Sequence, residues 1–450
     1  MTIEELPYTA NSCKLYEKIR HLGNSIFLDS AQPFSKSGRY DIISAAPLKV
    51  YKHVSSNSKI TATEYLEILR NGLLQLGPVE NTENLPFIGG YLGYFSYEFN
   101  HDSHKLAYKA QLQQPSPLSI NGLYSWAIIN DHHDKVTRLA IHPDTPSELQ
   151  NTLNQILLKT SSAPPKQPFV LLKPFIAELS RADYQKAFNR CQTYISEGDC
   201  YQINLTQRFT SYYQGDCWQA YTQCREITAA PFSAFIEFEQ ATILSFSPER
   251  FLHIDDNTLS SSPIKGTAPR GNTEEEDLKL KNELLQSEKN QAENLMIVDL
   301  LRNDLGKNCL PGSINAKRLF ELESFKTVHH LVSTITGHLK PHHDAFEVIR
   351  SSFPGGSITG APKRRAMEII DELEATPRSI YCGSIGYISL DQKMDTNIAI
   401  RTLECLDDRI YGWAGGGIVA DSNCESEYQE CFAKIGKILS CLESINSESH

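Results

Sequence analysis

The chain has 450 residues, of which 40% are hydrophobic and 22% are charged, as is usual for a globular protein with a large core. The net charge of −11 and the absence of a Lys/Arg block argue against nucleic-acid binding, so an anionic substrate would need a local cluster or a metal. The eleven cysteines are scattered without a CxxC pair, which favours reduced thiols over a disulfide framework or a zinc site.

The N-terminal part begins with acidic residues 1–5, which no apolar run follows, so no signal peptide is expected. No apolar stretch is long enough to span a bilayer, and we expect a cytoplasmic protein that contacts no membrane. Residue patterns predict strands at 26–30 and 40–44, a helix at 62–76, a glycine-interrupted apolar run at 86–95, and two strands within 122–142.

The Pro-rich residues 161–168 are the clearest candidate for a boundary in the chain. They are either a linker between two regions, 1–160 and 170–445, or a surface loop inside one domain.

Beyond this segment, helices and strands alternate to the end of the chain. Ser180 caps a predicted helix at 181–197, and a capping box at Thr273 opens a helical region that extends to about 305 with a break near Ser287. The other predicted elements are helices at 344–350, 362–374 and 427–442, and strands at 201–209, 234–238, 242–246, 383–390, 394–406 and 410–418.

Residues 262–270 predict a strand end that runs into a tight turn and carries Lys265. A lysine on a solvated turn is the commoner arrangement. The functional alternative is a lysine held where a substrate meets its amine, which is a nucleophile only when neutral. Lowering its pKa from about 10.4 to near 7 costs roughly 4–5 kcal/mol, which burial or a nearby cation can supply.

Two segments carry carboxylates that could hold a metal. Glu427, Glu430 and Lys434 share one face of the last predicted helix, either as a solvated stripe or as a pair of Mg²⁺ ligands beside a lysine. Glu293 lies in an increasingly apolar helical segment, so it is either at the polar edge of the helix or beside a cation.

Two glycine-rich segments could bind an anion through backbone N–H groups, although each is a weak signal alone. They are residues 351–363, which lead into a helix, and residues 415–419. His330 is either a donor to substrate or, more commonly for a single histidine, a satisfied core residue.

Together these segments resemble the chorismate-using enzymes: anthranilate synthase component I, aminodeoxychorismate synthase component I, and the isochorismate and salicylate synthases. The resemblance covers essentially the whole chain and is strongest after residue 180. Its motifs are residues 232–235, 247–251, the lysine turn, 299–304, the glycine-rich loop through Lys363, and 427–434. It implies an α+β fold in which two large antiparallel sheets pack together, with helices outside and the site in a cleft between the sheets.

Two positions indicate the branch of this family. Anthranilate synthases have alanine where this chain has Lys265, and the lysine form resembles the aminodeoxychorismate enzymes. The isochorismate and salicylate enzymes place a water-activating lysine where this chain has Gln202, and glutamine cannot act as that base.

The resemblance also implies roles for individual residues. Lys265 would add to C2 of chorismate while Glu249 protonates the departing 4-hydroxyl, after which ammonia attacks C4 and expels the lysine. Glu293 and Glu430 would bind Mg²⁺ directly, and Glu427 would bind it through water. The substrate site would be formed by His330, Thr359, Arg401, Gly416, Gly417 and Lys434.

Two partners follow from the same resemblance. No Gly-x-Cys-x-Gly nucleophile elbow surrounds any cysteine, so ammonia is expected from a separate glutamine amidotransferase subunit. The product would be 4-amino-4-deoxychorismate for para-aminobenzoate and folate synthesis. Alternatives are an anthranilate synthase component and a chorismate-binding subunit without chemistry. A bound tryptophan is expected to contact Ser30, Ser37, Gly38, Arg39, Tyr40, Pro231, Phe232 and Ser233.

Overall fold

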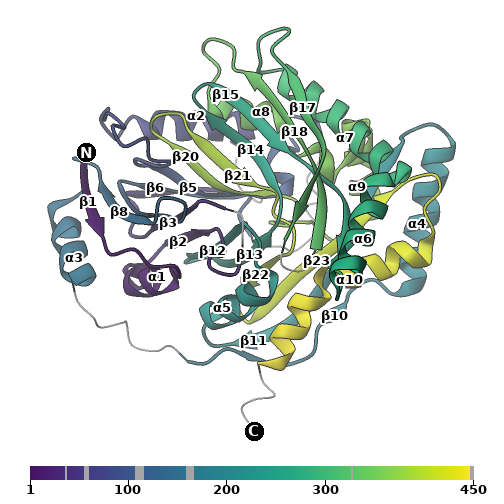
Figure 1. Ribbon diagram of the computed structural model, residues 1–450, viewed down its shortest axis with the longest axis horizontal. Helices are drawn as coiled ribbons and strands as arrows, with labels where there is room; N and C mark the ends of the chain where they lie inside the picture. Colours follow the sequence, from purple (N-terminus) through teal and green to yellow (C-terminus); the bar gives the residue numbers. More distant parts are fainter. Residues whose placement is uncertain (36–37, 55–59, 107–115, 159–166, 326–327, 446–450) are drawn as a thin grey trace.

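The computed structural model describes residues 1–35, 38–54, 60–106, 116–158, 167–325 and 328–445. Two antiparallel sheets form the two layers in Figure 1, with α1 and α3 at one end and α4, α9 and α10 at the other. The α+β class and the two-sheet architecture expected from the resemblance are confirmed.

The larger sheet has thirteen strands. In spatial order its main path is β1 (Thr2–Leu6), β8 (Val136–Ile141), β7 (Trp126–Asp131), β3 (Tyr40–Ser44), β2 (Ser25–Asp29), β12 (Phe232–Phe238), β13 (Ala241–Ser247), β22 (Thr402–Leu406), β23 (Arg409–Ile418), β11 (Gln202–Gln214) and β10 (Ile176–Ala177). The short strands β9 (Val170–Leu171) and β19 (Gly360–Ala361) also pair with β11.

The second sheet has ten strands. Its order is β16 (Ile264–Pro269), β18 (Val328–His338), β15 (Thr258–Ser262), β14 (Arg250–Asp255), β21 (Met394–Asn397), β20 (Ser384–Ser389), β5 (Gly90–Phe95), β6 (Ser119–Tyr124) and β4 (Lys49–His53), while β17 (Asn315–Ser324) pairs with β18.

Helices surround the sheets, and their caps follow the sequence. Ser180 accepts from the Asp183 amide and Thr273 from the Glu276 amide, as predicted. The α-helices are α1 (Cys13–Ile19), α2 (Ala62–Leu73), α3 (Ser147–Leu158), α4 (Arg181–Ser196), α5 (Cys217–Thr228), α6 (Glu274–Gln286), α7 (Glu288–Gly306), α8 (Ala345–Ser352), α9 (Lys363–Leu373) and α10 (Cys424–Ser444). Within the described ranges, no helix is both long enough and apolar enough to cross a membrane.

Strands from both predicted regions lie side by side in each sheet. β2 pairs with β12 through Phe27 opposite Phe235, and β5 pairs with β20 through Gly93 opposite Gly386. Residues 159–166 of the Pro-rich segment lie outside the described residues, and the division between 1–160 and 170–445 stays a prediction.

The single strand predicted at 394–406 is wrong, because the chain changes sheets within it. β21 belongs to the ten-stranded sheet and β22 to the thirteen-stranded one, and Arg401 takes a φ of +52° at the crossing. A second crossing, from β13 to β14, runs beside the first. The Ile398 amide donates to the Glu249 carbonyl at 3.0 Å, and the Phe246 amide donates to the Arg401 carbonyl at 3.1 Å. Glu249 and Arg401 are therefore held together where the chain passes twice between the sheets.

Candidate active site

Lys265 lies on β16, at the edge of the ten-stranded sheet. The strand does not end there as predicted but continues through a bulge, with a register shift against β18 between Ile264 and Thr267 and a φ of +96° at Gly266. A β-carbon on Gly266 would lie 3.1 Å from Leu284 and 3.2 Å from Asn290, so the glycine allows α6 and α7 to approach.

The amine of Lys265 is half-buried and donates to the Ser357 carbonyl at 3.4 Å. Burial lowers its pKa, nearby Glu249 opposes that shift, and the positive charge of Lys434 reinforces it. The lysine is therefore neither on a solvated turn nor far from carboxylates, and its neutral form is favoured by its surroundings.

Glu249 is buried between the two sheets, in the link from β13 to β14. Burial raises the pKa of its carboxyl group to about 7, although the charge of Lys265 and a hydrogen bond from Ser357 both oppose the shift. The Ser357 hydroxyl donates to Glu249 Oε1 at 3.0 Å. A carboxyl group with this pKa can be protonated near neutral pH and can act as a proton donor.

The glycine-rich loop supplies both contacts, because Ser357 binds Glu249 through its hydroxyl and Lys265 through its carbonyl. Thr359, the residue expected to line the substrate site, is fully buried and donates its hydroxyl to the Gly355 carbonyl at 3.0 Å. Its predicted role stays a prediction. The sequence did not indicate Ser357. Ser357 and Thr359 both carry hydroxyl groups in the same loop, and only the folded backbone shows that Ser357 is the one that contacts Glu249.

A buried ion pair fixes this loop to α7. Lys363 Nζ lies 2.6 Å from Asp304 Oδ2 and also donates to the carbonyls of Ser352 at 3.0 Å and Pro354 at 2.9 Å. On the other side of the loop, buried Arg378 donates to the Ile358 carbonyl at 2.8 Å. The loop that carries Ser357 is therefore held from two sides.

The predicted face of α10 meets β23 at Gly416. A β-carbon on Gly416 would lie 2.9 Å from Glu427 Oε2, 3.7 Å from Glu430 Oε1 and 3.7 Å from Lys434 Nζ. Lys434 pairs with Glu430 at 2.6 Å and donates to the Gly415 carbonyl at 2.8 Å. Burial raises the pKa of Glu427, and the neighbouring charge of Glu430 adds to the shift. The three residues converge at Gly416, where Glu427 is buried while the side chains of Lys434 and Glu430 are 42% and 48% exposed, so their role as metal and substrate ligands stays a prediction.

Glu293 lies on α7, where its carboxylate pairs with Lys289 at 3.9 Å. The negative charges of Glu293 and Glu430 both raise the pKa of Lys265, against the effect of burial, so carboxylates on α7 and α10 lie within electrostatic range of the same amine. In the described part of the chain, no three His, Cys, Asp or Glu residues are close enough together to form a complete metal cage. The hard oxygen donors converging at Gly416 nevertheless fit Mg²⁺, which usually takes one or two carboxylates and completes its shell with water and substrate oxygens.

His330 and Arg401 complete the set of predicted site residues. His330 is buried and shares a hydrogen bond with Thr267 Oγ1 at 2.8 Å, and burial lowers its pKa to about 3, so its ring is neutral at physiological pH. Burial also lowers the pKa of Arg401, against the charge of Glu249. Within the described ranges Arg401 forms no ion pair, which leaves its guanidinium available to an anion.

Comparison with known proteins identifies the family of this chain. The family model described as chorismate binding enzyme matches residues 23–440. The chain belongs to the chorismate-binding enzyme family.

Relatives within the family differ in their similarity to this chorismate-binding enzyme. Aminodeoxychorismate synthase component 1 of Escherichia coli (strain K12) is 43% identical over 438 residues, covering 95% of each chain. Anthranilate synthase component 1 of Aquifex aeolicus (strain VF5) is 32% identical over 470 residues, covering 98% of this chain and 94% of its own. Among solved structures, anthranilate synthase component I from Streptococcus pneumoniae TIGR4 matches with a TM-score of 0.78 and 28% identity, covering 89% of this chain and 92% of its own.

This chorismate-binding enzyme also has a cavity of about 490 Å³ next to the crossings between the sheets. Pro248 and Arg250, the neighbours of Glu249, line it. Six of the residues predicted to contact tryptophan also line the cavity: Gly38, Arg39, Tyr40, Pro231, Phe232 and Ser233. Ser37 lies outside the described residues.

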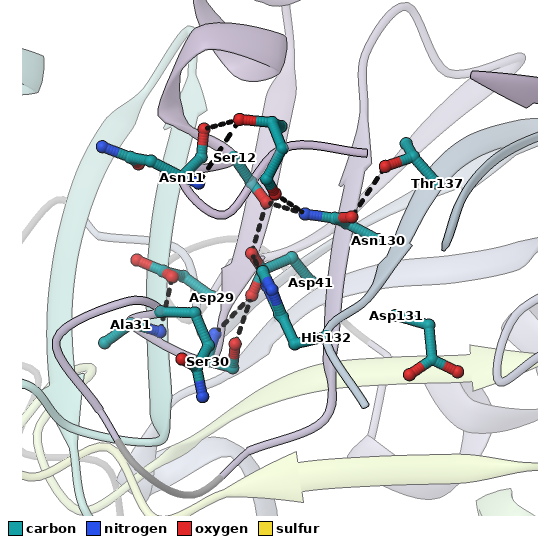
Figure 2. A network of polar contacts seen from close by, with 12 residues as sticks. Asn11, Ser12, Asp29, Ser30, Ala31, Asp41, Asn130, Asp131, His132 and Thr137 are labelled. Carbon is teal, nitrogen blue, oxygen red and sulfur yellow. Dashed lines mark hydrogen bonds and ion pairs between the residues drawn. The ribbon is translucent and has the colours of Figure 1, made fainter. Parts of the chain in front are cut away.

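Ser30, the remaining residue of the predicted tryptophan site, belongs to a buried polar network (Figure 2). Asp41 accepts from the Ser30 amide at 2.7 Å and the Ser30 hydroxyl at 2.6 Å. The same carboxylate lies 2.7 Å from His132 Nε2 and accepts from the Ser12 hydroxyl. Ser30 is therefore fixed by Asp41 on β3, next to the strand residues that line the cavity.

Proposed function

We propose that this chain is the chorismate-binding component of an aminodeoxychorismate synthase. The observation that carries the proposal is Lys265, whose amine is half-buried and kept towards its neutral form beside the protonatable Glu249. The relatives named aminodeoxychorismate synthase component 1, at 41–46% identity, support the same assignment. Its reaction would convert chorismate and ammonia to 4-amino-4-deoxychorismate, a precursor of para-aminobenzoate and folate.

In the proposed reaction, Lys265 forms a bond to C2 of chorismate as both double bonds of the ring diene shift and the C4–oxygen bond breaks. Glu249 gives its proton to the departing hydroxyl, which leaves as water. Ammonia then attacks C4, both double bonds shift back, and the Lys265 amine leaves C2. Two easier displacements replace one difficult one, which is the advantage of a covalent nucleophile.

The remaining residues bind and orient the substrate. Glu293 and Glu430 would hold Mg²⁺, with Glu427 close by. The bound ion would neutralise the ring carboxylate of chorismate. Arg401, Lys434 and the backbone at Gly416 and Gly417 would hold the substrate's carboxylates. His330 would line the ring site as a neutral side chain, since burial keeps its pKa near 3.

We further propose two partners for the chain. A separate glutamine amidotransferase would supply ammonia in the cytoplasm, as the word "component" in the relatives' names suggests. Tryptophan would occupy the cavity, whose lining combines the rings of Tyr40 and Phe232 with the charged Arg39 and Glu323. Aromatic faces and paired charges suit a zwitterionic aromatic amino acid.

Mass spectrometry of the product formed from chorismate, Mg²⁺ and ammonium tests the assignment. We expect an amino product that keeps the enolpyruvyl group. Anthranilate, a fluorescent aromatic amine without that group, would instead indicate an anthranilate synthase component. Unchanged chorismate under all conditions would favour a binding subunit without chemistry and would contradict the proposal.

A further inference from the structure

Two of the predicted metal ligands have a lysine four residues away on their own helix. Lys289 pairs with Glu293 on α7 at 3.9 Å, and Lys434 pairs with Glu430 on α10 at 2.6 Å. The two lysines differ in their surroundings. Lys434 is also held by the Gly415 carbonyl, whereas the Lys289 side chain is 56% exposed and, among the described residues, forms an ion pair with Glu293 alone.

The positive charge of Lys289 interacts with carboxylates on both α7 and α10. Besides its pair with Glu293, its positive charge favours the ionised form of Glu427 on α10. With Lys434, it gives two ammonium groups beside three carboxylates, those of Glu293, Glu427 and Glu430. These two lysines therefore offset part of the negative charge of the carboxylates without any bound ion.

A divalent ion entering this group meets a cation already in place. Repulsion between the two cations opposes binding. An exposed ion pair contributes only about 0–1 kcal/mol, so the Lys289 ammonium is easily released to water. A monovalent ion that displaced it would bring no additional charge to the carboxylates, whereas a divalent ion would.

We propose that Lys289 holds the place of the divalent cation in the metal-free protein and leaves Glu293 when the ion binds. Competition with this internal ammonium then sets the affinity for Mg²⁺ and disfavours monovalent ions. The inference rests on the proposed function, because it takes Glu293 and Glu430 as the magnesium ligands.

Calorimetric titration of Mg²⁺ into the substrate-free protein at low ionic strength tests this competition. We expect Lys289→Met to bind Mg²⁺ roughly two- to fivefold more tightly than the wild type, the range that one exposed ion pair allows. Lys289→Arg should keep the wild-type affinity, and K⁺ should weaken Mg²⁺ binding more in Lys289→Met than in the wild type.

Lys279→Met is the matched control, because Lys279 pairs with Glu283 four residues later on α6 at 3.8 Å, and its side chain is 74% exposed. It removes the same charge and should leave the affinity unchanged. An equal rise in Mg²⁺ affinity in both variants would show that only the net charge matters, and would contradict the inference. Unchanged or weaker Mg²⁺ binding in Lys289→Met would also overturn it. A wild type that binds no Mg²⁺ would overturn it as well. The product assay with ammonia is read separately, so an amino product with unchanged Mg²⁺ affinities would refute this inference alone.

Discussion

Lys265 and Glu249 need opposite protonation states, and burial favours the required state of each. Burial lowers the pKa of the lysine and raises that of the carboxyl group, while the attraction between their charged forms opposes both shifts. Burial is the largest cause for each group, so it shifts the lysine towards its neutral form and raises the pKa of the acid to about 7.

Replacement of the nucleophile is the most direct test at this scale. We expect Lys265→Ala to lower formation of the 4-amino product by roughly 10³-fold or more, since losses of catalytic nucleophiles are of this order or larger. Mg²⁺ binding, followed by calorimetry, should persist because the carboxylates remain. Wild-type turnover in this variant would remove Lys265 from the mechanism.

The pH profile tests Glu249. Its pKa of about 7 means that the protonated, proton-donating form is present below pH 7 and is lost as the pH rises through that value. We expect kcat to fall above pH 7 when free ammonia is held constant. In Glu249→Gln, kcat should drop by about 10²–10⁴-fold and this falling limb should disappear. The same limb in the variant would assign it to another group.

At the scale of elements, the glycine-rich loop depends on the Asp304–Lys363 pair. The lysine joins α7, which carries Glu293, to the loop, which carries Ser357. The Asp304–Lys363 pair thus links the helix that carries a predicted metal ligand to the loop that contacts the predicted acid.

Breaking this pair should affect both stability and catalysis. We expect Lys363→Met to lower the free energy of unfolding by about 3 kcal/mol, because it leaves the Asp304 carboxylate buried with fewer cations. Urea denaturation measures this loss, and kcat should fall in the same variant. The double variant Lys363→Met/Asp304→Leu should regain stability but not kcat, and recovery of both would show that the pair has no positioning role.

Local patterns predicted many elements near their observed positions. The capped helices at Ser180 and Thr273 and the 234–246 hairpin follow from capping residues and alternation that need no distant partner. The crossing at 398–401 could not be predicted, because the apolar pattern continues through it and only the partner strands show the change of sheet. The pairing of β17 with β18 was not anticipated, and two register shifts interrupt it.

At the scale of the whole molecule, buried acids make stability depend on pH. Glu404 is buried on β22, and burial raises its pKa from 4.5 to about 7. Stability from its protonated form is fully present below pH 4.5 and is lost as the pH rises through 7.

Substitution of Glu404 tests this dependence. Glu404→Gln should raise the free energy of unfolding by up to about 3 kcal/mol at pH 8.5 and leave it nearly unchanged at pH 4.5. Chemical denaturation at the two pH values gives the comparison. Glu239→Gln, with an 81% exposed side chain, is the control and should show no such difference. An equal effect of Glu404→Gln at both pH values would contradict the assignment.

Sequence motifs predicted the site residues more completely than sequence patterns predicted the fold. The family motifs identified Glu249, Lys265 and the α10 face, which the structure brings near one another. Composition and alternation indicated a strand-rich protein, but the two-sheet architecture came from the resemblance. Pairs such as Phe27 with Phe235 join residues about two hundred positions apart, and no local signal specifies them.

This interleaving has a consequence for synthesis on the ribosome. The edge of β2 stays unpaired until residues 232–238 have been translated, and that of β5 waits for residues 384–389. Open strand edges promote aggregation of a nascent polypeptide. We therefore expect truncated translation products to need holding chaperones and to recover no partial fold when these are withdrawn.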